Sequence, residues 1–366
     1  MPLGKKIEIK NVKPVDYPAV AEFLQQQKAS DFTIDQWREK FLVFWDHNPF
    51  FREDKHERGW LLRDETCTVC GFLGNIPIQY ARCGQEETGF ALTTWYVRDD
   101  ARKHSLELYG CFMDQTGVLI NTTPTFEVEE LLKGVLKFLP LTADWLKRDY
   151  FFPVRSGAFS RYLQERFKLH PLFKSINFAA AFIAMIISNV VARTRSKGPS
   201  LVDVKEVIEP PADTQQWWDA FKAEHPFTIA RHSMGLRYFF FSGEYLKTRR
   251  VLELRSHGEL LGFLGVRLVS RPEYSYVEVI DIALFRDDAS MYLTLVDKLR
   301  ELVLRWKPDI AFIKTNAFSE PMRNALNRSG FWSVAGRARF YYFDPQGQIG
   351  ANEFYGTPLD GDRVCF

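Results

Sequence analysis

Apolar residues recur along this chain either at every second position, as in a strand, or with the period of a helix. Strand-like runs followed by a helix-like segment occur twice, in the same order. Runs with a period of two are rich in Val, Ile, Thr, Tyr and Phe, which is typical of half-buried β-strands. Segments with a helical period follow them at residues 105–115 and 291–306 and predict amphipathic helices. The strand-like runs are residues 76–84, 87–97, 266–274 and 275–285.

Two tetrapeptides mark an internal repeat. Gly-Phe-Leu-Gly occupies residues 71–74 and again 262–265, and Arg-Asp-Asp-Ala occupies residues 98–101 and again 286–289. Matched tetrapeptides in the same order indicate that one fold has been used twice. The predicted order in each half is helix, β-hairpin on a central strand, helix, strand, helix and terminal strand. We therefore predict an α/β chain with a mixed sheet in each half.

The first half also carries start signals for its leading elements. Helices are predicted over residues 18–27 and 34–44, and the second begins at Thr33, which forms a capping-box pattern with Gln36. A sheet strand is predicted over residues 59–65. The later elements of the two halves are the short β-runs 118–124 and 309–316 and the helices 127–138 and 320–330.

Length and composition favour two folded domains. The chain has 366 residues, which at about 150 residues per domain predicts two. The 48 Lys and Arg residues nearly balance the 46 Asp and Glu residues, and this argues against a nucleic-acid binder because phosphates require a clear basic excess. The predicted boundaries are residues 1–158 for the first domain, 159–200 for a basic helical linker, 201–346 for the second domain and 347–366 for a tail.

Cysteine and histidine usage gives no sign of a disulfide framework or a metal site. Cys67 and Cys70 form a Cys-x-x-Cys pair inside a strand-like run, and no second pair completes a zinc site. The seven histidines show no metal-type spacing, and the sequence has no Gly-x-Ser-x-Gly nucleophile motif. Residues 1–12 lack an apolar segment of the secretory type, so we expect the reducing cytoplasm. The other cysteines are Cys83, Cys111 and Cys365.

Residues 176–192 form the most apolar window of the chain, and the sequence leaves its role open. We favour a linker helix buried between the two domains. The alternative is a helix that lies on an anionic membrane surface, which would make the protein peripheral at the inner face of a membrane. A spanning segment is disfavoured because the window falls short of the roughly 20 residues that cross a bilayer comfortably. The basic residues that flank the window are Arg161, Arg166, Lys168 and Lys174 before it and Arg193, Arg195 and Lys197 after it.

Two stretches resemble a known family. The first consists of Asn316, Pro321, Ala325, Leu326, Gly330, Phe331 and residues 338–343. It is similar to the GNAT (Gcn5-related N-acetyltransferase) fold from its fifth strand, through the following helix, into its last hairpin. Residues 95–108 resemble the central strand, pyrophosphate-binding turn and helix start of the same family. The resemblance implies two tandem GNAT-like acyl-CoA N-acyltransferase domains joined by a helical linker.

The paired arrangement, with its Gly-Asp tail at residues 359–366, is similar to tandem GNAT proteins of bacterial exopolysaccharide and cell-envelope synthesis. This resemblance implies transfer of an acyl group from acetyl-CoA or a longer acyl-CoA to an amine. The acceptor that it implies is an amino sugar or a sugar-nucleotide-linked amine. We expect no metal and no nucleic acid in this reaction, and the sequence leaves the oligomeric state open.

The resemblance also implies a coenzyme A site in the first half. GNAT proteins hold the pyrophosphate on backbone N–H groups at a helix N-terminus, where the helix dipole adds favourable charge. Arg102 and Ser105 match this turn, whereas Leu106 and Glu107 depart from its small residues. The second half has carboxylates at residues 287–288, which repel a diphosphate. The implied cofactor-binding residues are Thr94, Tyr96, Val97, Arg102, Lys103, His104, Ser105 and Asn121.

Acyl transfer to an amine needs a group that accepts the ammonium proton and a group that protonates the thiolate. Glu87 is the base candidate of the first half, and Glu278 and Asp281 are the candidates of the second. The spacing of three places Glu278 and Asp281 on opposite faces of a regular strand. The tyrosine acid of the family is replaced by Phe126 and Phe318, so the thiolate takes its proton from another residue or from solvent.

Two alternatives stand beside the N-acyltransferase prediction. The first is a Fem-like aminoacyltransferase, also a GNAT pair, which uses charged tRNA. The net charge of +2 and the lack of a long basic stripe count against it. The second is a non-catalytic GNAT pair that acts as a binding module at a membrane surface.

Overall fold

The structure, a computed structural model, describes residues 6–168, 170, 174–195, 202–243, 245–306, 309–336, 338–350 and 353–360. Lys197, Cys365 and the predicted tail residues 361–366 lie outside the described residues. Contacts within the chain divide it into two units. Unit 1 comprises Met1–Leu141, His225–Ala230 and Arg339–Phe366, and unit 2 comprises Thr142–Glu224 and Arg231–Ala338.

Unit 1 is built on a mixed sheet with the strand order β1-β2-β3-β4-β5-β15-β6. Strands β4 and β5 run parallel, and the other neighbours in this order run antiparallel. Two further strands extend the sheet, because β9 pairs the end of β3 and β16 pairs β9. The strands are β1 Glu8–Asn11, β2 Gly59–Arg63, β3 Val69–Arg82, β4 Gln85–Val97, β5 Leu119–Asn121, β6 Leu139–Pro140, β9 Phe227–Ile229, β15 Tyr341–Phe343 and β16 Phe354–Tyr355.

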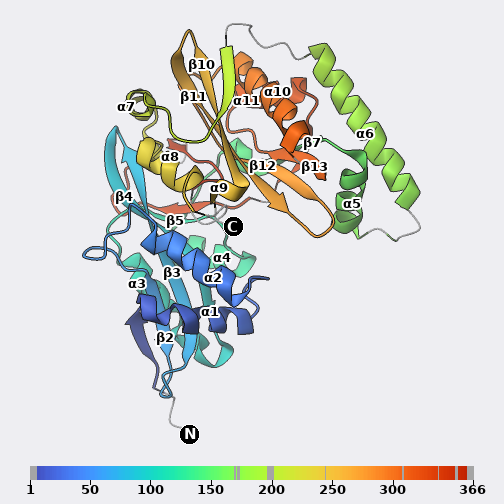
Figure 1. The fold of residues 1–366 in the computed structure, drawn as a ribbon. Coiled ribbons are helices and arrows are strands. Elements are labelled where there is room, and N and C mark those ends of the chain that lie inside the picture. The colour runs from blue at the N-terminus through green and yellow to red at the C-terminus, as the bar shows by residue number, and fades with distance from the viewer. Residues whose placement is uncertain are drawn as a thin grey trace. The chain divides into compact units, whose positions relative to one another are not determined.

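Helices cover both faces of the unit 1 sheet (Figure 1). On one face, α1 and α2 pack on β3, and the rings of Phe41 and Phe72 lie 5.8 Å apart. On the other face, Leu108 of α3 and Leu132 of α4 join a core cluster with Leu92 of β4. The helices are α1 Tyr17–Gln26, α2 Ile34–Phe41 with a π-helical extension Leu42–Asp46, a 3₁₀ helix Asp99–His104, α3 Ser105–Met113 and α4 Phe126–Gly134.

Several sequence predictions for unit 1 are confirmed. Helix α2 begins after Thr33, whose hydroxyl accepts from the backbone N–H of Gln36 in the predicted capping box. Of the Cys-x-x-Cys pair, Cys70 is buried within β3 and Cys67 is exposed in the turn before it. Both thiols are free. The period of two therefore identified the hairpin strands correctly.

Unit 2 contains a second mixed sheet with the order β14-β7-β13-β12-β11-β10-β8. Strands β12 and β13 run parallel, as β4 and β5 do in unit 1. The other neighbours run antiparallel. The strands are β7 Arg148–Pro153, β8 Val202–Val207, β10 Arg249–Ser256, β11 Glu259–Ser270, β12 Ser275–Leu284, β13 Ile310–Thr315 and β14 Trp332–Ala335.

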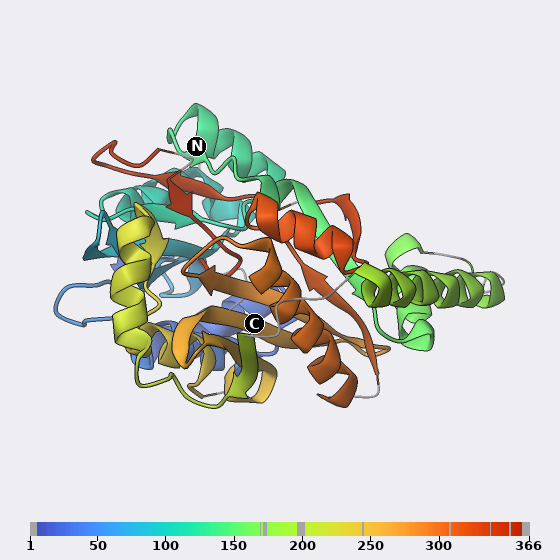
Figure 2. The ribbon, with the colours of Figure 1, turned by 90° about the horizontal axis from the view of Figure 1, so that it is seen from above.

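Alternating side chains of β11 point to the two faces of the unit 2 sheet. Leu264 and Val266 belong to a core cluster with side chains of α10 and α11. On the opposite face, the ring of Phe263 lies 4.9 Å from that of Trp217 on α7. The helices are α5 Ser156–Phe167, α6 Lys174–Arg195, α7 Thr214–Glu224, α8 Ser233–Phe240, α9 Tyr245–Thr248, α10 Ala289–Trp306 and α11 Glu320–Arg328. Figure 2 shows α5 and α6 side by side at the rim of unit 2.

In the strand order of each sheet given above, one strand comes from the other half of the sequence. Strand β7 follows the first-half elements in the chain, but it lies between β13 and β14 in unit 2. Strand β15 follows the second-half elements, but it lies between β5 and β6 in unit 1. The linear boundaries predicted at residues 158 and 346 do not include this exchange. Periodicity predicts that a segment is a strand, but it does not say which sheet the strand joins.

Helix α6 is largely exposed, so the prediction of a buried linker helix is wrong. The segment Ser175–Thr194 is long and apolar enough to cross a membrane by length and composition, with a mean hydropathy of 1.9. Only 22% of this segment is buried inside the protein. The buried positions are Asn177, Ala181, Ser188 and Ala192, which form one stripe at helical spacing.

Candidate active site

Strand β4 of unit 1 runs past the end of its parallel partner. The ladder between β4 and β5 pairs Phe90 with Leu119 and Ala91 with Ile120, and β4 then continues to Val97. A β-bulge interrupts β4 in this extension, where Thr94 adopts a left-handed φ of 51°. Where a strand continues beyond the end of its neighbour, its backbone N–H and C=O groups on that edge are unpaired and can bind an extended ligand. Beyond Ala91 and Ile120 the two strands are no longer paired, and we call this end of their ladder the opening of unit 1.

The predicted residues of the β4 extension border this opening. Thr94 and Tyr96 are half-buried, and Val97 is buried. Asn121 ends β5 as a buried residue, and its side-chain oxygen accepts from the backbone N–H of Thr123 at 3.3 Å. The structure thus places Thr94, Tyr96, Val97 and Asn121 on the two strands that border this opening, and their role in binding stays a prediction.

The turn after β4 carries the predicted cations, and their shortest ion pairs are local, although Arg98 also pairs with Asp64 at 3.4 Å. Arg98 bonds both oxygens of Asp100 at 2.6 and 3.0 Å, and Arg102 pairs with Asp99 at 2.7 Å. The side chains of Arg102 and Asp99 are 72% and 89% exposed. An ion pair this exposed contributes about 0–1 kcal/mol. A bound diphosphate can therefore take Arg102 from Asp99 at little cost.

Helix α3 begins at Ser105, directly after the cationic turn. Lys103 is exposed, and the Nδ1 atom of His104 lies 2.9 Å from a carboxylate oxygen of Glu107. The N-terminus of a helix favours negative charge because its first N–H groups point outward. Arg102, Lys103, His104 and Ser105 are thus gathered at a helix N-terminus, although Glu107 adds a carboxylate to the same turn.

Two aromatic residues beside the opening were missed as a pair by the sequence analysis. The rings of Trp95 on β4 and Tyr109 on α3 lie 4.6 Å apart. The Nε1 atom of Trp95 is buried and makes no hydrogen bond within the described part of the chain. Burial raises the pKa of Tyr109, and the nearby Asn121 amide opposes the shift. The sequence signal available for Tyr109 was its position on the buried side of α3. That position fits a core residue as well as a site residue.

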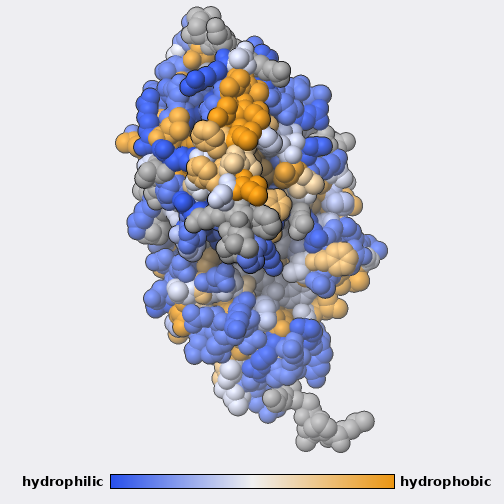
Figure 3. Space-filling model, turned by 90° about the vertical axis from the view of Figure 1, so that its right-hand side faces the viewer, coloured by the Kyte–Doolittle hydropathy of each residue, from blue (hydrophilic) through white to orange (hydrophobic). Residues whose placement is uncertain are grey.

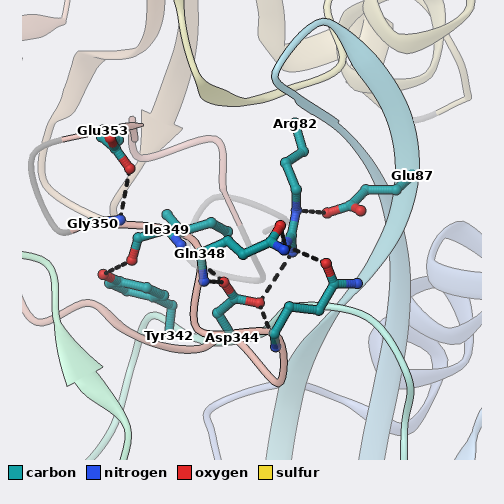
Figure 4. A network of polar contacts seen from close by, with 9 residues as sticks. Arg82, Glu87, Tyr342, Asp344, Gln348, Ile349, Gly350 and Glu353 are labelled. Atoms are coloured by element: carbon teal, nitrogen blue, oxygen red, sulfur yellow. Dashed lines mark hydrogen bonds and ion pairs between the residues drawn. The ribbon is translucent and has the colours of Figure 1, made fainter.

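Glu87 lies elsewhere on β4, in a network at the start of the strand (Figure 4). Arg82 donates from Nε to Glu87 at 2.6 Å and from a terminal nitrogen to Asp344 at 3.2 Å. Seven residues separate Glu87 from Thr94, which corresponds to about 23 Å at the rise of a strand. Glu87 therefore does not reach a group bound at the opening, and the structure does not place this base candidate in the site.

The same network fixes the C-terminal segment on unit 1. Burial raises the pKa of Asp344, but backbone N–H groups of Gln346, Gln348 and Ile349 and the charge of Arg82 outweigh it and hold the pKa below its ordinary value. Asp344 is therefore charged at neutral pH. The Arg82–Asp344 pair thus secures the segment that carries β15.

At the corresponding end of the ladder in unit 2, the residues of β12 are buried. The ladder between β12 and β13 ends with Glu278 opposite Lys314, and β12 continues to Leu284. Beyond the ladder, Asp281 accepts two hydrogen bonds from Arg231, at 2.9 and 2.8 Å. Both of these side chains are almost fully buried. A carboxylate held in this way has both oxygens engaged by a guanidinium.

Two other carboxylates of unit 2, those of Glu278 and Asp288, also accept hydrogen bonds. Glu278 accepts from Arg267 at 2.8 Å and from Lys314 at 3.1 Å. At the start of α10, the carboxylate of Asp288 accepts from the backbone N–H of Ser290 at 2.7 Å. The chain's own carboxylate thus occupies the helix end that would face a diphosphate. Glu278 and Asp281 lie near this end of the unit 2 ladder, but they hold neighbouring cations there.

Comparison with known proteins identifies the fold. No family model matches the chain, and no curated protein matches its sequence. Among solved structures, the chain is similar to Saccharomyces cerevisiae N-myristoyltransferase with bound myristoyl-CoA, with a TM-score of 0.54, 12% identity, and coverage of 94% of this chain and 80% of that one. The chain therefore adopts the fold of that structure over 94% of its length. It has the GNAT fold.

Two other solved structures support the same assignment. A GCN5-related N-acetyltransferase from Anabaena variabilis matches with a TM-score of 0.54 and 7% identity, covering 92% of this chain and 72% of that one. An Enterococcus faecalis protein described as a probable N-acyltransferase matches with a TM-score of 0.54 and 8% identity, covering 93% and 72%. The predicted pair of GNAT-like domains is therefore confirmed at the level of the fold. The two GNAT units differ at this end of the ladder, since unit 1 has half-buried residues there and unit 2 has a buried ion pair.

Proposed function

We propose that the protein is an acyl-CoA-dependent N-acyltransferase and that unit 1 binds the acyl donor. The observation that carries this proposal is the β4 extension of unit 1, where Thr94 and Tyr96 remain half-buried beside a cationic helix start. Unit 2 lacks this combination in its described residues, because Asp281 forms a buried ion pair with Arg231 beyond the ladder and Asp288 occupies the helix start. The bound myristoyl-CoA of the yeast neighbour supports a thioester as the donor.

In this proposal the pantetheine arm lies along the β4 edge as an added strand, and the pyrophosphate lies at residues 102–105. The amine nitrogen attacks the thioester carbonyl, the carbon–sulfur bond breaks, and an amide forms. The thiolate leaves as coenzyme A and takes one proton, while the amine loses one. The reaction therefore needs no further co-reactant.

The proton of the amine passes to solvent in this proposal. Glu87 is about 23 Å from Thr94 along the strand. Glu278 and Asp281 are base candidates of unit 2 only, and each accepts hydrogen bonds from a cation. The amine must then react in its neutral form, so the rate of transfer should rise with pH up to the pKa of the acceptor amine.

We propose an amino sugar, or an amine linked to a sugar nucleotide, as the acceptor, in the synthesis of a bacterial exopolysaccharide in the cytoplasm. The sequence resemblance to tandem GNAT proteins of the cell envelope supports this choice. A Fem-like reaction with charged tRNA is the alternative acceptor chemistry, and the net charge of +2 speaks against it. A non-catalytic binding module is the alternative without chemistry.

The donor site is tested by calorimetric titration of the protein with acetyl-CoA, longer acyl-CoAs and free coenzyme A. We expect saturable binding, and we expect Arg102→Ala combined with Lys103→Ala to weaken it about tenfold, or about 1.4 kcal/mol, because two phosphate contacts are lost. Arg286→Ala, in the corresponding turn of unit 2, is the matched control and should leave the affinity unchanged.

Measuring the release of free thiol from acyl-CoA distinguishes the N-acyltransferase, the Fem-like aminoacyltransferase and the binding module. Release of free thiol that depends on an added amino sugar supports the enzyme, and release that depends only on charged tRNA supports the Fem-like alternative. Thioester binding without any amine-dependent release supports the binding module. If no thioester binds at all, the proposal of a donor site in unit 1 is wrong.

A further inference from the structure

Helix α6 exposes a broad apolar face to solvent (Figure 3). The face consists of seven large side chains that are 44% to 68% exposed: Ile176, Phe178, Phe182, Ile183, Ile186, Ile187 and Val190. At 100° per residue, these side chains cover about 180° of the helix circumference. A contiguous apolar surface of this kind marks an interaction site in a soluble unit.

The opposite face of α6 is fixed to unit 2. Asn177 donates to the backbone carbonyl of Ser160 at 2.8 Å, and Trp332 donates from Nε1 to the hydroxyl of Ser188 at 2.7 Å. Gly330 has a left-handed φ of 80°, and a Cβ atom at this position would lie 2.4 Å from the Ser188 carbonyl oxygen. This close approach requires glycine. The docked helix therefore lies along the unit and does not cross a bilayer.

Charge around this face is mostly positive. The sequence has no Asp or Glu between residues 174 and 195. Arg193 is exposed near the end of α6, and Arg166 and Lys168 are exposed at the end of α5. The carboxylates nearby are Glu165 and Glu273 beside α5 and, beside Arg193, Asp297 and Glu301, which pair with Arg300 and Lys298. Phe167, between these two cations, is 65% exposed. Apolar side chains bordered by cations are complementary to a bilayer with anionic headgroups.

We infer that the apolar face of α6 docks unit 2 on a lipid surface that carries anionic headgroups. The helix lies in the plane of the interface, its isoleucines and phenylalanines enter the acyl boundary, and its flanking cations meet phosphates. A second copy of the chain fits less well, because a two-stranded helical seam covers a narrower stripe than this face. The inference stands independently of the proposed acyl transfer.

Co-sedimentation with vesicles tests this inference. The full chain is mixed with vesicles of phosphatidylcholine alone or with added phosphatidylglycerol. We expect binding to the anionic vesicles that weakens in 0.5 M salt, since surface charge attraction is screened. Ile183→Glu combined with Ile187→Glu should lower the bound fraction at least tenfold. Ile208→Glu is the matched control, because Ile208 is an 86% exposed isoleucine after the edge strand β8, whereas α6 packs on β7 near the other edge of the sheet. This variant should bind like the natural chain.

A quenching measurement that needs no charged substitution protects the test from misfolding of the charged variant. Ile187→Trp should lose fluorescence on vesicles of brominated lipid, whereas Ile208→Trp should not. Failure of the natural chain to bind anionic vesicles, or equal binding by the Ile183→Glu and Ile187→Glu variant with a native circular dichroism spectrum, would overturn the inference. A lipid-free dimer that Ile183→Glu dissociates would also overturn it and assign the face to a second copy. Acyl-CoA affinity in solution is measured separately, so the two proposals can fail independently.

Discussion

Replacing Asp281 with Ala is expected to lower the free energy of unfolding by about 3–5 kcal/mol, because Arg231 then stays buried without its bidentate carboxylate. The two side chains are 0% and 3% exposed, and two hydrogen bonds of 2.9 and 2.8 Å join them. Breaking such a pair costs far more than the pair contributes, since a buried charge loses its counter-charge. Urea unfolding monitored by circular dichroism measures the effect.

Two control variants make this result specific. Glu320→Ala breaks an exposed pair with Arg323, whose atoms lie 2.9 Å apart, and should cost less than about 1 kcal/mol. Replacing both partners, with Arg231→Met and Asp281→Leu, should recover most of the lost stability because no charge is then left buried. An Asp281→Ala variant of natural stability but without acyl transfer would contradict this account and support Asp281 as a catalytic base.

Tyr342→Ala is expected to destabilise unit 1 by about 3–5 kcal/mol, the usual cost of removing a buried aromatic side chain. Tyr342 lies on the exchanged strand β15, is fully buried, and donates from its hydroxyl to the backbone carbonyl of Ile349 at 3.0 Å. Hydrogen exchange should then increase in β5, which pairs β15, and should stay unchanged in β13.

The conservative variant Tyr342→Phe separates packing from hydrogen bonding. It keeps the ring and loses one hydrogen bond, so we expect a cost of about 0.5–1.5 kcal/mol. If Tyr342→Ala instead increases exchange in β13 and leaves β5 protected, the strand belongs to the half of the chain that precedes it, and the exchange of strands is contradicted.

The sequence was sufficient for the elements and the repeat, because these depend on local patterns. Alternation predicted the β3–β4 hairpin, Thr33 predicted the start of α2, and the repeated tetrapeptides predicted two copies of one fold. The same signals placed Thr94 and Asn121 on neighbouring strands of one sheet. Cations after the central strand were likewise predicted correctly to gather at a helix start.

The remaining features depend on contacts between residues far apart in the chain. Asp281 between two isoleucines suggested a reactive carboxylate, but its partner Arg231 lies 50 residues away. Apolar residues of α6 suggested burial, although only one stripe of the helix packs. The exchange of β7 and β15 left no trace in periodicity, because a strand has the same pattern in either sheet.

Hydrogen exchange of the natural chain with and without a non-hydrolysable acyl-CoA analogue tests the donor site most directly. The account predicts added protection in residues 92–105, at the β4 extension and the helix start of unit 1, and no change in residues 279–291 of unit 2. Protection confined to residues 279–291, or no protection in either segment at saturating analogue, would contradict it.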